Sequence, residues 1–285
     1  MNDLYKIEGT DHNIGNKYYL KHANYFPDFQ KRLQDFKSLL LRQVEFEEEG
    51  ASYVHFGDGD YFFLKAKSVG SAGVGKRAIG KSYSEINHKE FVNGAKLNDF
   101  YTCELYERNR KLFSEVLQNI KINYPAEYGY GLVANKWFFK TFKGRIGIIG
   151  ADSKVEIIKN LMNQKEYQEY LGLEKFNDYI KIPQKFACDD IDKTEGMVEQ
   201  QLKNSTSDIF LVGIGHVKSG LMHRLKKHKK AIYLDVGSGI DAIAGIIDIG
   251  RPYFGDWTNY KLRDYNYSEV DYLAYTGKGK HITLD

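Results

Sequence analysis

The sequence has few cysteines and no long apolar run, and these two shortages exclude several classes of protein. Its 285 residues include only two cysteines, Cys103 and Cys188, in no CxxC or Cys/His spacing. A structural zinc site and a disulfide framework are therefore not expected. No stretch approaches the roughly 18 apolar residues of a membrane span, and residues 1–8 lack the apolar core of a signal peptide. These absences favour a protein of the reducing cytoplasm.

An excess of charge of one sign is also lacking. The formal net charge is only +3, so the composition does not demand a nucleic-acid partner. The basic run from Arg224 to Lys230 is typical of the solvated end of a helix, although it could also contact phosphate or an anionic membrane. Low-complexity segments are absent, and 42% of the residues are apolar, which favours a globular chain over a disordered one.

The order of apolar and polar residues predicts the first elements. Residues 1–23 are polar and aperiodic and are expected to form an N-terminal arm. Residues 24–285 contain no evident linker and are expected to form a single α/β domain. Helical spacing of apolar residues predicts a helix from Pro27 to Glu49. The further predictions in this half are a strand at 52–56, a turn at 57–59, a buried strand or helix start at 61–64, a glycine-rich loop at 68–82 and a long helix at 98–120.

Three apolar segments in the second half share one pattern, in which a glycine turn follows the segment and leads into a helix. These segments are residues 145–149, 207–212 and 231–235. Continuous apolar runs are typical of strands that are buried on both faces, and the strand–turn–helix order favours parallel pairing with crossover helices. The predicted fold class is therefore α/β, with a Rossmann-like, mostly parallel sheet flanked by helices.

The glycine turns after these strands are candidate ligand sites. In open parallel sheets, ligands bind outside the carboxyl ends of the strands, where the following helix offers free N–H groups to an anion. One such turn could be merely structural, but three in series favour a nucleotide-type ligand. His216 could contact phosphate or ribose or simply begin a helix. Asp235 could bind ribose or metal or cap a turn. The residues concerned are Gly150, Gly213, Gly215, His216, Asp235, Gly237 and Ser238.

Two phosphate-binding motifs are approached but not completed. The turn at Gly213 has its third glycine two positions too late for GxGxxG, so the motif does not support an NAD enzyme. Residues 70–77 nearly match GxxxxGK[ST], but Arg77 cannot supply the hydroxyl that a P-loop places on magnesium. Lys76 and Arg77 are therefore expected either on a basic loop over an anionic substrate or in a solvated loop.

The turn Gly57-Asp58-Gly59-Asp60 carries the most specific chemistry. Carboxylates at positions i and i+2 can converge on one hard cation, and the glycines leave room for a diphosphate beside it. Mn²⁺ or Mg²⁺ suits such oxygen ligands and would neutralise a leaving diphosphate. The same four residues could instead form a hairpin turn, for which Asp-Gly is a common signature.

The segment His55-Phe-Gly-Asp-Gly-Asp60 resembles the Arg-Phe/Tyr-Gly-Asp-Gly-Glu signature of GT-D-type glycosyltransferases, a family defined by a DxE motif. The later pattern is similar too. A strand with a glycine-rich turn at 209–215 is followed by a strand ending in Asp-x-Gly at 232–237. The resemblance spans roughly residues 30–262.

This resemblance implies a Rossmann-like, metal-dependent glycosyltransferase. It would move a sugar from a nucleotide-diphosphate sugar, typically UDP-linked, to a glycan or glycoprotein acceptor. Asp58 and Asp60 would hold the Mn²⁺ or Mg²⁺, which also makes Asp60 a candidate catalytic residue. Three positions depart from the family pattern, because Asp60 stands where Glu is expected, His55 where Arg is common and Ser238 where His is frequent.

Other roles and functions remain open. Asp241 and Asp256 are candidate general bases, because a carboxylate would activate the acceptor hydroxyl in an inverting transfer. The segment from Asp235 to Gly239 also resembles the acidic glycine turn that holds adenosylmethionine in methyltransferases. A non-catalytic nucleotide-binding module is the third possibility.

Overall fold

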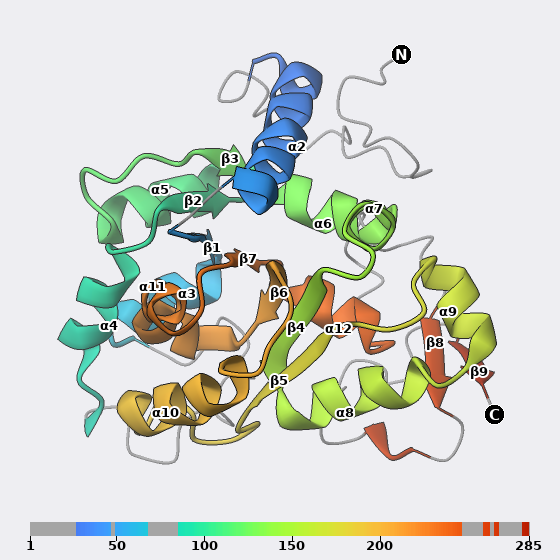
Figure 1. Cartoon of the computed structure of the whole chain (residues 1–285). Coiled ribbons are helices and arrows are strands. Elements are labelled where there is room, and N and C mark those ends of the chain that lie inside the picture. The colour runs from blue at the N-terminus through green and yellow to red at the C-terminus, as the bar shows by residue number, and fades with distance from the viewer. Residues whose placement is uncertain are drawn as a thin grey trace.

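The computed structural model of this chain describes residues 27–46, 49–67, 85–246, 259–262, 265–267 and 281–284. The expected N-terminal arm, the glycine-rich loop with Lys76 and Arg77, and Asp256 lie outside these residues, so these predictions stay predictions. In the described part, helices flank a seven-stranded sheet (Figure 1). This arrangement confirms the predicted α/β, Rossmann-like fold class.

All neighbouring strands of the large sheet are parallel, in the order β3-β2-β1-β7-β6-β4-β5. The carboxyl ends of the strands therefore lie at one edge of the sheet. At the centre of the sheet β1 pairs with β7, which are the first and last of its strands in sequence order, so residues far apart in sequence meet there. The strands are β1 (Ala51–Phe56), β2 (Phe100–Cys103), β3 (Tyr124–Pro125), β4 (Ile146–Ala151), β5 (Asp178–Ile182), β6 (Ile209–Gly213) and β7 (Ile232–Asp235), and a separate parallel pair is formed by β8 (Asn259–Leu262) and β9 (His281–Leu284).

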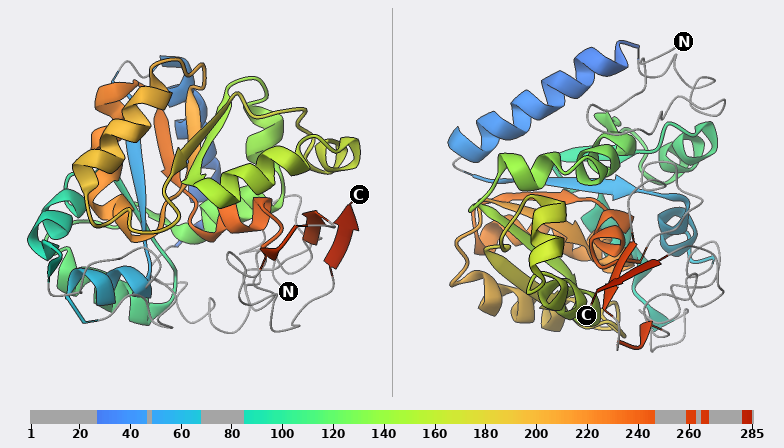
Figure 2. Two further views of the ribbon diagram at one scale, coloured as in Figure 1. Left: turned by 90° about the horizontal axis from the view of Figure 1, so that it is seen from below. Right: turned by 90° about the vertical axis from the view of Figure 1, so that its right-hand side faces the viewer.

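Helices cover both faces of the sheet. In the left view of Figure 2, α10 and α11 lie on one side of the strands, and α8 and α9 lie on the other. The first face carries α3 (Asp58–Leu64), α4 (His88–Ala95), α5 (Glu107–Val116), α10 (Ile191–Leu202) and α11 (Lys218–His228). The second face carries α2 (Phe29–Phe46), α6 (Ala126–Ala134), α7 (Trp137–Thr141), α8 (Asp152–Leu161), α9 (Lys165–Leu171) and α12 (Ser238–Ile243).

The alternation of side chains along each strand divides the interior into two cores. In β6, Ile209 and Leu211 pack into the core with α2 and α8, whereas Phe210 and Val212 pack into the core with α4 and α11. The strand is apolar at every position because both of its faces are buried. None of the described helices is long and apolar enough to cross a membrane.

The predicted helix at 98–120 is confirmed only over α5 (Glu107–Val116). Residues 100–103 form β2, which pairs with β1 from Tyr53–Phe100 to Phe56–Cys103, and α5 begins only at Glu107. Pairing with β1 buries Tyr101 and Cys103 in the sheet. The helical spacing from Leu105 to Ile120 therefore extends beyond both ends of α5.

The segment at 61–64 is helical, and the hairpin alternative for Gly57–Asp60 is excluded. The strand β1 passes directly into α3, whose first turn contains Asp58 and Asp60. The Asp60 carboxylate accepts a hydrogen bond from the Gly57 N–H at 2.8 Å, which closes the first turn of the helix. Asp60 is thereby fixed at the carboxyl end of β1.

Candidate functional site

The carboxyl ends of β1, β7 and β6 bring three predicted site residues together. Asp60 follows β1, Asp235 is the last residue of β7, and His216 lies in a 3₁₀ turn (Gly215–Val217) after β6. The chain leaves β1 toward the α3 face and leaves the adjacent β7 toward the α12 face. Such a divergence of connections is the usual ligand site of a parallel α/β sheet.

A lysine joins the two aspartates of this edge. The Lys218 Nζ atom lies 3.0 Å from Asp60 Oδ2 and 3.0 Å from Asp235 Oδ2. Their side chains are only 8%, 7% and 1% exposed, respectively. We call these three residues the buried ionic cluster. Because Lys218 begins α11 and the acids come from α3 and β7, the cluster ties three elements to one another.

The backbone satisfies most of the remaining acceptors of the cluster. Asp235 Oδ2 accepts the His55 N–H at 3.1 Å, and Asp235 Oδ1 accepts the Gly237 N–H at 2.9 Å. The other oxygen of Asp60 faces His216, whose Nδ1 is 3.5 Å from Asp60 Oδ1. The His216 ring stacks on Phe63 of α3, with ring centroids 4.8 Å apart and planes 4° from parallel. The first turn of α3 is therefore packed directly against the turn after β6.

Burial and charge attraction act in opposite directions on these groups. Burial raises the pKa of Asp60, but the attraction of Lys218 and the nearby His216 ring outweigh it and hold that pKa well below its usual range. Burial lowers the pKa of Lys218, yet the attraction of Asp235 and Asp60 raises it above its usual range. For Asp235 burial is the larger effect, and its pKa is raised despite Lys218. One ammonium faces two carboxylates, and Asp60 is the better stabilised anion. Such perturbed groups at strand ends are typical of functional sites.

An imidazole–phenol pair lies beside the cluster. His55 of β1 and Tyr130 of α6 are both buried, and His55 Nε2 is 2.9 Å from Tyr130 Oη. A Cβ atom on Gly237 would lie 3.3 Å from Tyr130 Oη, and one on Gly57 would lie 3.5 Å from His55 Nε2. Gly237 has a backbone φ of +48°, which residues other than glycine rarely adopt. The two glycine turns therefore lie directly next to this pair.

Packing accounts for two other glycines that were expected to contact a nucleotide. Gly150 of β4 and Gly213 of β6 are partners in the sheet. A Cβ atom on Gly213 would meet Ile240 Cγ1 at 2.6 Å, and one on Gly150 would meet Ile240 Cγ2 at 3.3 Å. The Ile240 side chain of α12 fills the space over both positions. Gly215, by contrast, has a φ of +58° and open space where a Cβ would be.

The remaining predicted residues differ in what surrounds them. Gly59 and Asp58 lie in the first turn of α3, where Asp58 is half-buried and its carboxylate has no hydrogen bond or ion pair within the described ranges. Ser238 Oγ is buried without a hydrogen-bond partner among the described residues. Asp241 forms an ion pair with Lys154 of α8 and does not join the cluster.

The two acids expected to hold a metal do not fit that role equally. Asp60 does not fit, because its carboxylate is already occupied by an ammonium, a backbone N–H and a histidine. Asp58 presents a carboxylate that a cation could reach. Within the described residues, no group of three or more His, Cys, Asp or Glu side chains is arranged to hold a metal ion.

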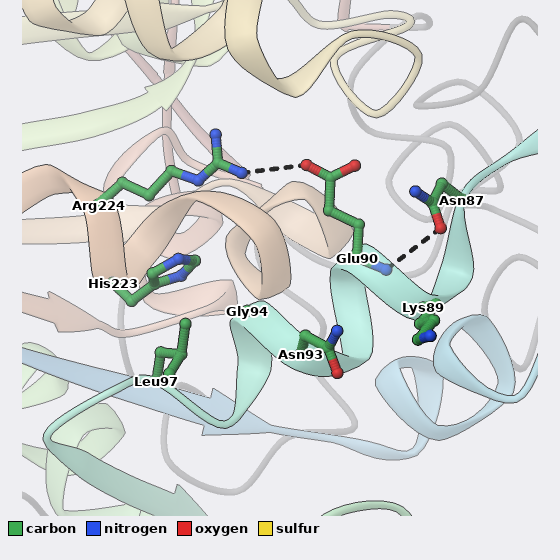
Figure 3. A pocket seen from close by; sticks show the side chains of 8 residues that line it. All are labelled: Asn87, Lys89, Glu90, Asn93, Gly94, Leu97, His223 and Arg224. Atoms are coloured by element: carbon green, nitrogen blue, oxygen red, sulfur yellow. Dashed lines mark hydrogen bonds and ion pairs between the residues drawn. The ribbon is translucent and has the colours of Figure 1, made fainter.

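A pocket of about 310 Å³ between α4 and α11 includes none of the predicted site residues (Figure 3). Arg224 lines this pocket, and its guanidinium already pairs with Glu90 of α4 and with Glu195 of α10. Three other residues of the basic run are also engaged, with Lys226 bound to Asp99, His228 to Glu195 and Lys230 to Glu49. These pairs favour a structural role for the basic run, and the strand ends are the stronger candidate site.

Sequence reasoning misses Lys218 and Tyr130. A weak signal exists for Lys218, since it is a lone charge beside Ser219, Gly220 and Leu221 just after a predicted ligand turn. No comparable signal marks Tyr130, because the chain has 22 tyrosines and its partner His55 is distant in sequence.

Comparison of the chain with protein-family models, with curated proteins and with solved structures finds no match in any of the three.

Proposed function

We propose that this chain is a glycosyltransferase that uses a nucleotide-diphosphate sugar, typically UDP-linked, and transfers the sugar to a glycan or glycoprotein acceptor. One observation carries the proposal. The acidic turn after β1, which resembles a glycosyltransferase signature, lies against the turns after β6 and β7 through Asp60, His216 and Asp235. These are the turns where a parallel sheet binds nucleotides.

In this proposal the nucleoside lies across the turns at Gly215–His216 and Gly237–Ser238, and the diphosphate lies beside Asp58. Three carboxylates and one ammonium leave the described edge with excess negative charge. A diphosphate here requires additional positive charge. Lys76 and Arg77 of the glycine-rich loop are its expected source, and an accompanying Mn²⁺ or Mg²⁺ would have Asp58 as its protein ligand. Asp241 and Asp256 stay the candidate general bases.

The methyltransferase alternative is less well supported by the contacts of Asp235. An acid at a strand end binds the ribose of an adenosine ligand through free carboxylate oxygens. Both oxygens of Asp235 already accept hydrogen bonds, from His55, Gly237 and Lys218. Adenosylmethionine therefore serves only as a competing ligand in the experiment described next.

A thermal-shift screen with UDP, GDP, CDP and adenosylmethionine, each with and without Mn²⁺, tests the proposal. At about 100 times its Kd, the nucleotide of the true donor should raise the Tm by roughly 5–10 °C. Asp58→Asn should reduce any part of this shift that needs Mn²⁺. The matched control is Glu166→Gln, an exposed first-turn acid of α9, another seven-residue helix.

Three outcomes have distinct meanings. Stabilisation by UDP or another nucleoside diphosphate, together with slow hydrolysis of the matching sugar nucleotide, supports a glycosyltransferase. Stabilisation by adenosylmethionine alone contradicts the proposal. Stabilisation by a nucleotide without any donor hydrolysis identifies a binding module in place of an enzyme.

A further inference from the structure

The Lys218 ammonium lies where a cation bridging two acids would lie. Its nitrogen is 3.0 Å from an oxygen of Asp60 and 3.0 Å from an oxygen of Asp235, and all three side chains are buried. Asp235 ends β7, and Asp60 lies in the first turn of α3, which follows the adjacent strand β1. Paired carboxylates at such a position form the oxygen-rich environment that Mg²⁺ and Mn²⁺ prefer.

We propose that Lys218 is a built-in replacement for a divalent cation. It holds Asp60 and Asp235 together and keeps metal ions off this acid pair. Occupation of the acid pair by Lys218 does not depend on the proposed sugar transfer.

Competition between the ammonium and a metal follows from the surrounding contacts. A metal ion bound between the two acids would have to displace Lys218, which would leave a buried ammonium without its partners. Backbone hydrogen bonds also hold the two carboxylates in their orientation toward Lys218. The Gly57 N–H donates to Asp60, and the His55 and Gly237 N–H groups donate to Asp235.

Removal of the ammonium should reverse this preference. Without Lys218, two buried carboxylates would face each other with no ammonium between them. Their mutual repulsion would be relieved by a divalent cation. The native pair should thus exclude Mn²⁺, and a variant that lacks the ammonium should gain a site for it.

Lys218→Met tests this directly, because Met removes the charge and keeps an unbranched side chain. Mn²⁺ binding is measured by the loss of the free-ion electron paramagnetic resonance signal, and Tm is measured in EDTA and in Mn²⁺. We expect Lys218→Met to bind Mn²⁺ about tenfold or more tightly than the native chain and to regain Tm when Mn²⁺ is added. The control is Lys226→Met on the same helix, which removes the exposed ion pair with Asp99 and should leave Mn²⁺ binding unchanged.

A second measurement uses the native chain and Asp60→Asn. If Lys218 holds Asp60, then Asp60 is not a ligand of Mn²⁺ in the native chain. Asp60→Asn should therefore have the same Mn²⁺ affinity as the native chain, both if the native chain binds no Mn²⁺ and if it binds the ion through Asp58. A tenfold weakening by Asp60→Asn would overturn the inference, as would a folded Lys218→Met variant that binds Mn²⁺ no better than Lys226→Met. If Lys218→Met does not fold in EDTA or Mn²⁺, the native comparison decides alone. Failure of UDP to bind would refute the proposed function and leave this result unaffected.

Discussion

At the scale of single residues, two buried carboxylates show that burial alone does not decide protonation. Asp60 has the Lys218 ammonium at 3.0 Å, and its pKa is held well below the usual range. Glu127, in the first turn of α6, is fully buried and accepts the Leu105 N–H at 3.0 and 3.2 Å. Burial and the repulsion of Glu104 raise the pKa of Glu127 to about 8. At Asp60 the attraction of Lys218 helps to outweigh burial, whereas at Glu127 the weaker attraction of Arg110 does not.

Glu127 should make the protein less stable as the pH rises. Its folded-state pKa of about 8 exceeds the ordinary value of 4.5, so the folded chain keeps a proton that the unfolded chain releases between these values. Stability is therefore lost as pH increases through this window. Glu127→Gln should abolish the effect, so its free energy of unfolding relative to that of the native chain should rise by about 3–4 kcal/mol between pH 5 and pH 8.

Urea unfolding at pH 5, 6.5 and 8 measures this prediction. The exposed Glu166→Gln serves as the control, because it removes a carboxylate at a helix start without changing the interior. Parallel pH profiles for the native chain and Glu127→Gln would show that Glu127 does not hold its proton.

At the scale of elements, the position of Lys218 depends on how α11 packs. Helices α4 and α11 approach closely at Gly94, where a Cβ atom would lie 2.5 Å from the backbone oxygen of Ser219 and 2.9 Å from His223. Ser219 directly follows Lys218. Any outward movement of α11 at this crossing would therefore also move the ammonium relative to its carboxylates.

Two helical glycines should respond in opposite ways to alanine. Gly94→Ala places a methyl group against backbone and should lower the free energy of unfolding by about 1–3 kcal/mol. Gly196 of α10 has open space at the same position, so Gly196→Ala should raise stability by about 0.5–1 kcal/mol through helix propensity. Chemical denaturation of both variants measures the difference. Equal effects of the two substitutions would mean that the helices can separate at little cost.

The same scale shows what sequence patterns predict well. The strands β4, β6 and β7 were predicted because each is a continuous apolar run that ends at glycine or before a glycine turn. The short strands β2 and β3 carry no such pattern; β2 pairs with β1, and β3 pairs with β2. Local sequence therefore predicts strands that are continuous apolar runs, whereas these short strands depend on their neighbours in the sheet.

At the scale of the whole molecule, the parallel sheet assembles the site from distant segments. Sequence reasoning predicts that Asp60, His216 and Asp235 lie near strand ends, and the sheet order confirms that these ends are close. It does not predict the Lys218 contacts. An ion pair depends on the register of strands and on the packing of α11, which local patterns do not specify.

Nucleotide binding should therefore affect three distant segments at once. If UDP binds at the carboxyl edge, amide hydrogen exchange should slow together at residues 57–61, 214–218 and 236–240, which follow β1, β6 and β7. Residues 49–51 and 229–232 enter two of the same strands at the opposite edge and should not change. Exchange measured by mass spectrometry, with and without saturating UDP, compares the two edges within one sample. Protection at only one of the three segments would indicate a local anion contact. Protection at the opposite edge would place the ligand elsewhere, because a single nucleotide cannot contact both ends of a strand of six residues such as β1.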